Sequence, residues 1–140
     1  MDSVQVVCRG IRGAVTVPAN TAEDILEGTN QLLRALIELN DLDDPDAIAS
    51  AIFTTTSDLT ATFPAIAARD LGWNDVPLMC AHEMDVPGAL ERVVRVMLHV
   101  NTIRSSREMR HVYLKGAKAL RPGWGIEDDE LAAILAKRAR

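Results

Sequence analysis

The segment Ala22–Asn40 constrains the fold most, because its pattern is that of a capped amphipathic helix. Thr21 is a suitable N-cap residue, and Glu23 and Asp24 place negative charge in the first turn, where the helix dipole favours it. The apolar residues recur at helical spacing, as the positions Ile25, Leu26, Leu32, Leu33, Leu36 and Ile37 show. We therefore predict a helix over the whole segment, weakened but not broken by Gly28.

Strands are predicted on both sides of this helix. Val4–Val17 is rich in β-branched residues and contains Gly10 and Gly13, which indicates a strand with bends or bulges. Three further strands are expected, at Ala51–Thr56, at Val76–Ala81 and at Arg110–Lys118, the last one divided in two if Gly116 breaks it. Phe63–Leu71 is typical of a short helix, with Pro64 in its first position and Gly72 at its end, and Pro45 suits the start of a single helical turn.

The segment Ala89–Thr102 fits two structures. Helical spacing joins Leu90, Val93, Val94, Met97 and Leu98, whereas strict alternation joins Val94, Val96, Leu98 and Val100. Its length favours a helix. The predicted order is then β-α-β-(α)-β-α-β-(β), which indicates an α+β fold with a mixed β-sheet and helices on one face.

The chain has 140 residues, which suits a single domain. We place the main domain at residues 1–122 and a C-terminal tail at 123–140. Within the tail, Glu127–Arg140 carries acidic residues first and basic residues last, so it predicts a short helix. The sequence leaves open whether this helix docks on the domain or stays mobile.

Composition excludes several classes of function. The net charge is −5 and no long basic run occurs, so nucleic acid is not an expected partner. No apolar run is long enough to span a membrane, and the N-terminus lacks the pattern of a signal peptide, so we expect a cytoplasmic protein. Cys8 and Cys80 stand far apart without metal-ligand spacing, so neither a disulfide framework nor a metal site is predicted. Twelve of the fifteen basic residues are arginine, whose planar fork suits carboxylate recognition.

Individual motifs are weak. GxSxG, P-loop, GxGxxG and HExxH patterns are absent, and the three histidines are scattered. The arginines of RGIRG (Arg9–Gly13) are either solvated at a bend or brought close to an anionic ligand. CAHEMD (Cys80–Asp85) places a thiol and a carboxylate at the end of a short strand, where a plain surface glutamate is the alternative. Arg95 stands among aliphatic residues, so its charge either reaches to solvent or is buried with a partner.

Four blocks taken together resemble the AroH-type chorismate mutases, small monofunctional enzymes found in bacteria. They are RGIRGAVTV, DLTATFPAIAARDLGW, MCAHEMDVPGALERVVRVMLHV and RHVYLKGAKALRP. They cover about Val7–Pro122 in the family's order and with nearly its spacing. Four matched blocks are far more specific than any one motif.

The resemblance implies a fold like that of the Bacillus chorismate mutase. It also implies a homotrimer that forms a pseudo-α/β barrel, with active sites at the subunit interfaces. The implied activity is the [3,3] Claisen rearrangement of chorismate to prephenate in phenylalanine and tyrosine biosynthesis, without a cofactor or metal. Such a concerted step needs conformational restraint and charge stabilisation rather than a nucleophile, and a site rich in arginine fits it.

The resemblance also assigns roles to residues. Arg95 matches the arginine that faces the ether oxygen and a carboxylate, and Arg12 matches one that grips a substrate carboxylate beside the hydroxyl of Tyr113. Glu83 and Cys80 match the pair around the substrate's ring hydroxyl. The other matched binding positions are Met79 and Leu120, then Arg121, which closes over the site, and Phe63, Ala65 and Arg69, which lie on the edge contributed by the neighbouring subunit.

The chain departs from the family pattern at two positions: Ile66 replaces a lysine and Met79 replaces a threonine of a family member. Loss of the lysine removes one positive charge that would attract a dianion. Two other functions remain alternatives. A non-catalytic trimeric anion binder would keep Arg12 but lack Arg95 or Glu83, and all three are present. An enzyme resembling the trimeric enamine deaminases would have a similar sheet but other motifs.

Overall fold

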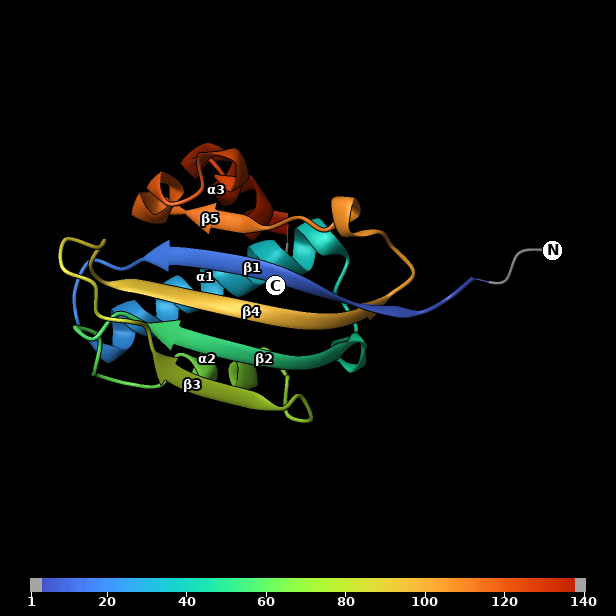
Figure 1. The fold of residues 1–140 in the computed structure, drawn as a ribbon, viewed down its shortest axis with the longest axis horizontal. Coiled ribbons are helices and arrows are strands. Elements are labelled where there is room, and N and C mark those ends of the chain that lie inside the picture. Colours follow the sequence, from blue (N-terminus) through green and yellow to red (C-terminus); the bar gives the residue numbers. More distant parts are fainter. Residues whose placement is uncertain (1–3, 138–140) are drawn as a thin grey trace.

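The computed structural model describes residues 4–137. Its centre is one five-stranded mixed sheet with the strand order β3-β2-β4-β1-β5 (Figure 1). The strands are β1 (Val7–Thr16), β2 (Ile48–Thr55), β3 (Leu78–His82), β4 (Val93–Thr102) and β5 (Val112–Leu114). β4 runs antiparallel to β1 and β2, while β1 pairs in parallel with β5 and β2 pairs in parallel with β3. The predicted α+β class with a mixed sheet is therefore confirmed.

Helices cover one face of this sheet. They are α1 (Ala22–Asn40), α2 (Ala65–Asp70) and α3 (Asp128–Lys137), and Figure 1 shows α1 and α2 behind the strands. α1 has the predicted bounds, and the Thr21 hydroxyl accepts the backbone N–H of Asp24 at 3.1 Å, as an N-cap should. The main core lies between α1 and the inward residues of β1 and β4, including Ile11, Val15 and Leu98.

The prediction of a helix at 89–102 is wrong. The segment from Val93 forms β4, the central strand, and residues 89–92 precede it as a turn. Val94, Val96, Leu98 and Val100 face the helix-covered core, so the alternating pattern outweighs the helical one. Burial between two neighbouring strands selects the β-structure, which a length argument cannot foresee.

Two glycines serve helix packing rather than a bulge. β1 pairs with β4 in unbroken register from Val7 to Thr16, so the predicted bulges are wrong. A Cβ at Gly13 would lie 3.0 Å from Leu32 and Leu36 of α1, and a Cβ at Gly28 would lie 2.6 Å from Val17. Small residues at both positions let α1 approach the strand closely.

The strand predicted at 110–118 is shorter than expected. Only Val112–Leu114 is strand, and a 3₁₀ turn, η3 (Lys115–Ala119), follows it. Further 3₁₀ turns are η1 (Pro45–Ala47), η2 (Ser106–Glu108) and η4 (Pro122–Trp124). η1 confirms the helical turn expected at Pro45. Pro64 lies at the N-cap position of α2, one residue before the helix begins, and not at the first helical position as predicted.

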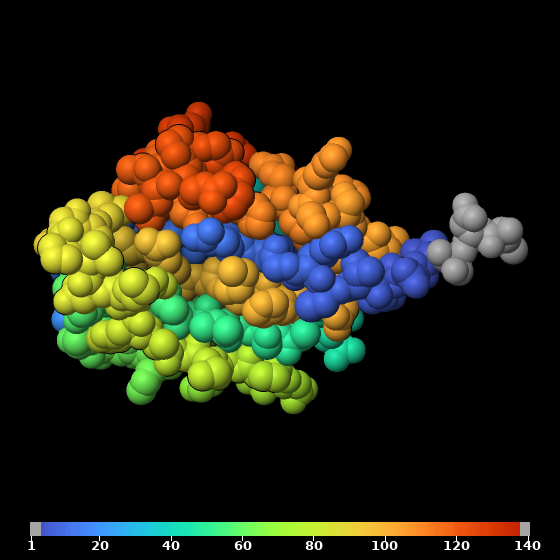
Figure 2. All heavy atoms as spheres, viewed as in Figure 1, coloured from blue at the N-terminus to red at the C-terminus, as the bar shows by residue number. Residues whose placement is uncertain are grey.

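The second face of the sheet carries no helix. Figure 2 looks onto this open face, where atoms of β1, β4, β2 and β3 are visible side by side. The segment after β5 covers only its β5 edge, where Ala14, Val93, Tyr113 and Ala117 form a small second core. The tail then returns to the main core, since Leu131 and Ile134 of α3 are buried there.

Candidate active site

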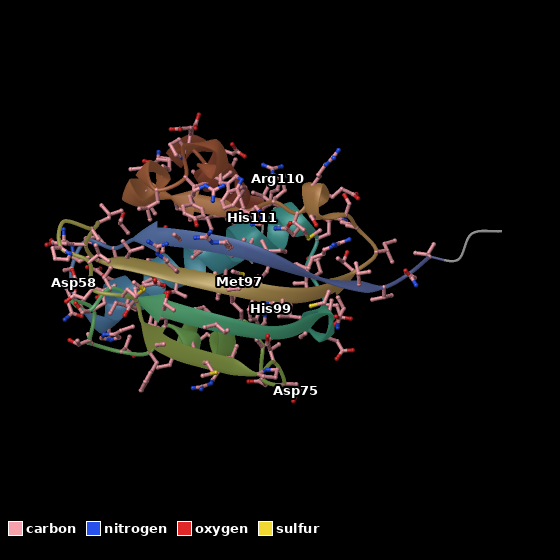
Figure 3. The ribbon with its side chains drawn as sticks, in the orientation of Figure 1. Asp58, Asp75, Met97, His99, Arg110 and His111 are labelled. Atoms are coloured by element: carbon pink, nitrogen blue, oxygen red, sulfur yellow. The ribbon has the colours of Figure 1, made fainter. Side chains whose placement is uncertain are left out.

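A cavity of about 420 Å³ opens on the helix-free face of the sheet, in the size range of small-molecule sites. Its lining combines four of the residues singled out in the sequence, Arg12, Glu83, Arg95 and Tyr113, with new ones. The lining consists of Arg12, Gly13, Ile52, Thr54, Glu83, Arg95, Val96, Met97, His99 and Tyr113. Met97 and His99 mark the position of β4 in Figure 3. Arg12, Arg95 and Glu83 together leave one net positive charge, which favours an anionic ligand.

Arg95 lies in the middle of the central strand. It pairs with Ala14 of β1 on one side and with Thr54 of β2 on the other. Its Nε is buried and has no hydrogen-bond partner within residues 4–137. A buried donor without a partner is costly in a fold, so its presence here is the strongest indication of a ligand acceptor.

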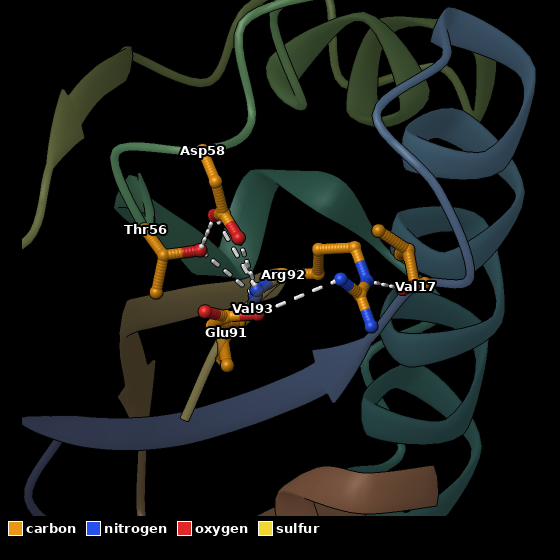
Figure 4. A network of polar contacts seen from close by, with 6 residues as sticks. All are labelled: Val17, Thr56, Asp58, Glu91, Arg92 and Val93. Carbon is orange, nitrogen blue, oxygen red and sulfur yellow. Dashed lines mark hydrogen bonds and ion pairs between the residues drawn. The ribbon is translucent and has the colours of Figure 1, made fainter. Parts of the chain in front are cut away.

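A polar network fixes the start of β4, two residues before Arg95 (Figure 4). Arg92 adopts a left-handed backbone conformation (φ 52°), and the Asp58 carboxylate accepts its N–H at 3.0 Å. The Thr56 hydroxyl donates to Asp58 and accepts the N–H of Val93 at 3.0 Å. The Arg92 guanidinium also reaches back to the carbonyl of Val17 at 3.3 Å. These bonds hold the strand entry and thereby the register that places Arg95.

Glu83 follows the end of β3 and turns toward the cavity. Its backbone N–H donates to the Thr55 carbonyl at 2.8 Å, and its carboxylate accepts the Thr54 hydroxyl. Thr54 is also the register partner of Arg95, so one threonine links the acid to the strand that carries the arginine. The carboxylate keeps further acceptor capacity for a hydroxyl of a ligand.

Arg12 lies on β1, opposite Met97 of β4 and diagonal to Arg95 on the same face. Its backbone N–H donates to Nδ1 of His111 at 3.0 Å, which fixes that nitrogen as an acceptor. Burial, and after it the charges of Arg12 and Arg121, lower the pKa of His111 below its ordinary value of 6.5. His111 is therefore neutral near pH 7 and lies beside β1 and β5 (Figure 3).

β5 and the segment after it place three more predicted residues at the β5 edge of the sheet. Tyr113 is buried yet lines the cavity, and Leu120 packs on the same small core. The guanidinium carbon of Arg121 lies 3.6 Å from the ring centroid of Trp124, and that ring is 5.7 Å from the ring of Tyr113. The other arginine of RGIRG, Arg9, does not line the cavity, and its Nε donates to the carbonyl of Arg104 at 3.1 Å.

Other predicted residues lie away from this cavity within one chain. Cys80 packs against the helix-covered core, on the opposite face from Glu83, and lines a separate hollow with the exposed Phe63. Ala65 is buried at the start of α2, and Arg69 is exposed on the same helix. Met79 is 66% exposed and pairs with the cavity residue Ile52. Ile66, one of the two predicted departures from the family pattern, is half-buried on α2.

Sequence reasoning missed Thr54, His111 and Trp124. Thr54 could have been found only with the sheet order, which sets it opposite Arg95. His111 and Trp124 carry no motif, and their rings meet at 4.0 Å only because the tail folds back.

A larger hollow of about 980 Å³ lies between the start of α1, residues 88–92 and residues 115–116. Its charged lining consists of Asp24, Glu27, Glu91, Arg92 and Lys115, which sum to one negative charge. Unlike the Arg95 cavity, it contains no buried donor that lacks a partner among residues 4–137. Size alone therefore does not make it the candidate site.

The described part of the chain has neither a metal-binding cluster nor a membrane-spanning helix. Within residues 4–137, no three His, Cys, Asp or Glu side chains lie close enough together to hold a metal ion. No helix in that range is long and apolar enough to cross a membrane.

Comparison with known proteins identifies one family. Residues 8–124 match the family model described as chorismate mutase type I. The chain is 48% identical over 114 residues to the chorismate mutase AroH of Thermus thermophilus, covering 81% of this chain and 93% of that protein. It is 47% identical over 115 residues to the chorismate mutase AroH of Bacillus subtilis strain 168, covering 81% and 90%. A solved chorismate mutase structure from Clostridium thermocellum has a TM-score of 0.77 and 54% identity, covering 79% of this chain and 97% of that chain. The chain therefore belongs to the AroH-type, type I chorismate mutase family.

Proposed function

We propose that this protein converts chorismate to prephenate at the open-face cavity, as its family membership supports. The observation that carries the assignment to this cavity is the buried Nε of Arg95, a donor without a partner in the chain. A concerted [3,3] rearrangement breaks the ether C–O bond as a C–C bond forms, and no proton or electron leaves the substrate. The enzyme has only to hold the folded substrate and stabilise the charge on the ether oxygen.

Each lining residue then has a role that its position supports. Arg95 Nε donates to the ether oxygen as the C–O bond stretches, when the negative charge on that oxygen grows. Arg12, with the Tyr113 hydroxyl nearby, binds a substrate carboxylate. Glu83 accepts a hydrogen bond from the ring hydroxyl, and its bond from Thr54 keeps the carboxylate oriented. Arg121 adds a second cation at the β5 edge, where it binds the other end of the dianion.

We further propose a homotrimer with each site completed by a neighbouring subunit. Within one chain the sheet separates Arg69 on α2 from Arg95 on the open face, so one molecule cannot bring both to the same ligand. Phe63 is 67% exposed at the β3 edge, and Met79 and Ile52 expose apolar surface beside the cavity. A second copy that covers this edge would bury those apolar side chains and bring its own Phe63 and Arg69 toward the cavity. The predicted contact of Cys80 with the substrate would have to come from its backbone, because Cys80 lies in the middle of β3 and its side chain packs against the helix-covered core.

The test is a direct assay of the purified protein. Chorismate absorbance should fall, and acid treatment should convert the product to phenylpyruvate, which identifies prephenate. Sedimentation of the same sample should give the mass of a trimer. Absence of turnover by the folded protein would contradict the activity, and a monomer with full activity would contradict the shared site.

A further inference from the structure

Trp124 stands at the centre of an aromatic and cationic cluster that the proposed function does not yet explain. Its ring lies 3.6 Å from the guanidinium carbon of Arg121 and 5.9 Å from that of Arg12. It also lies 4.0 Å from the ring of His111 and 5.7 Å from the ring of Tyr113. Three of these four neighbours are the proposed substrate-binding residues at this edge of the cavity.

Building on the proposed function, we propose that Trp124 is a positioning residue that holds Arg121 and Arg12 ready beside the cavity before the substrate arrives. The negative face of an indole attracts a guanidinium, and arginine stacks well on it. Two like charges at one edge would otherwise repel each other and turn toward solvent. The indole ring gives the two arginines a common partner in the free protein. Within residues 4–137, no carboxylate forms an ion pair with either arginine.

The backbone places Trp124 at this point by a closed loop. The chain leaves the sheet after Leu114, and the Trp124 N–H donates to the Arg121 carbonyl at 2.9 Å within the turn η4. Gly125 then pairs with Tyr113, and the Ile126 N–H donates to the Tyr113 carbonyl at 3.0 Å. The segment that carries Arg121 therefore begins just after Tyr113 and is bonded back to Tyr113 at its other end.

Helix α3 anchors this loop from outside. Its residues Leu131 and Ile134 are buried in the main core, and the Leu135 carbonyl accepts a hydrogen bond from Arg34 of α1 at 2.7 Å. α3 lies beyond the residues that match the family model, so this anchor is a property of this chain's own tail. A docked tail loses less conformational entropy on ligand binding than one that must first be ordered.

The first test measures KM and kcat for Trp124→Leu and Trp124→Phe, with Lys137→Ala as the control on the same tail. Leucine removes the aromatic face, so KM should rise roughly 3- to 30-fold, the value of one cation–π contact, with kcat changed less than about threefold. Phenylalanine retains a face and should recover most of the loss. Lys137 forms an ion pair with Glu38 at 3.8 Å on the side of α1 and lies outside the cavity lining, so its removal should leave KM unchanged.

A double-mutant cycle separates positioning from a merely structural role. In an Arg121→Ala background, Trp124→Leu should raise KM by a clearly smaller factor than in the parent protein, because the nearer of its two arginines is gone and only Arg12, at 5.9 Å, is left. Equal effects in both backgrounds, or equal values for Trp124→Leu and Trp124→Phe, would overturn the proposal.

A readout without chorismate keeps this inference distinct from the activity. The indole N–H signal of Trp124 is assigned by its loss in Trp124→Phe, and Arg121→Ala should shift it in the free protein. If the parent protein does not turn over chorismate, the proposed function fails, but the shift of this signal still tests whether Arg121 stacks on the Trp124 ring. An unmoved signal overturns the stack whatever the activity.

Discussion

Replacing Arg95 with methionine should lower the rate and leave the fold no less stable, a combination that few other arginines would show. The buried Nε has no partner in the chain, and an unsatisfied buried donor costs about 1–3 kcal/mol. Methionine removes that donor and retains apolar volume between Ala14 and Thr54. We therefore expect an unchanged or higher free energy of unfolding for Arg95→Met. A gain of about 1 kcal/mol would raise Tm by roughly 2–8 °C.

The rate should fall steeply because the donor faces charge that forms only in the transition state. Loss of one preorganised donor costs about 3–4 kcal/mol, or 10²–10³-fold in kcat. Arg95 also brings a full charge to a dianion, so Arg95→Met should exceed this range. Arg95→Lys keeps the charge without the rigid fork and should recover only part of the rate.

The assay pairs chorismate turnover with thermal unfolding of each variant, and Arg104→Met serves as the matched control. Arg104 bonds Asp41 at 2.6 Å, so its replacement should lower stability by up to about 1 kcal/mol and leave kcat unchanged. A fully active, well-folded Arg95→Met or Arg95→Lys would remove Arg95 from the mechanism. A strongly destabilised Arg95→Met would refute the argument from its unpartnered Nε.

Four further outcomes are expected. Arg69→Ala and Arg95→Ala should each have reduced activity. When the two variants are unfolded, mixed and refolded together, part of the activity should return, because a mixed trimer contains a cleft with both arginines intact. Mixed trimers without any regained activity would place both residues in one chain's site. Burial and two neighbouring arginines lower the pKa of His111 in the folded protein. As the pH falls below about 6.5, the unfolded chain therefore binds a proton at this residue before the folded protein does. The free energy of unfolding decreases over this range, down to the pKa of the folded state. The free energy of unfolding, measured with urea at pH 7.5 and at pH 5.0, should therefore fall less between these pH values in His111→Gln than in the parent protein. An equal fall in both proteins would contradict this. Leu131→Ala should lower the free energy of unfolding by about 2–5 kcal/mol if α3 is docked in solution, whereas no change would mean a detached tail. Chelation with EDTA should leave kcat and KM unaltered, since the rearrangement needs no Lewis acid, and recovery of lost activity by a divalent ion would refute that.

The sequence predicted best those elements whose signals are local. The helix Ala22–Asn40 has its cap, first-turn acids and apolar stripe within its own residues, and the structure confirms its bounds. β4 carries two overlapping periodicities, and only its position between β1 and β2 decides between them. Gly13 and Gly28 likewise depend on contacts with another element, which the sequence does not display.

The candidate site divides in the same way. Arg12, Glu83, Arg95 and Tyr113 belong to blocks that resemble a known family, and the structure brings these four to one cavity. Thr54 was missed because its role depends on strand register across the sheet. Trp124 and His111 were missed because a returning tail creates their contact. Phe63 and Arg69 lie apart from the cavity in one chain, so their predicted roles depend on a second copy.

The most direct test of this account is the structure of the protein with a bicyclic dicarboxylate that mimics the transition state. We expect the ether oxygen of the mimic within hydrogen-bond distance of Arg95 Nε, and one carboxylate on Arg12. We also expect the mimic's hydroxyl on Glu83 and the neighbouring subunit's Arg69 at the rim. A mimic bound elsewhere, with Arg95 Nε still unpartnered, would contradict the central claim.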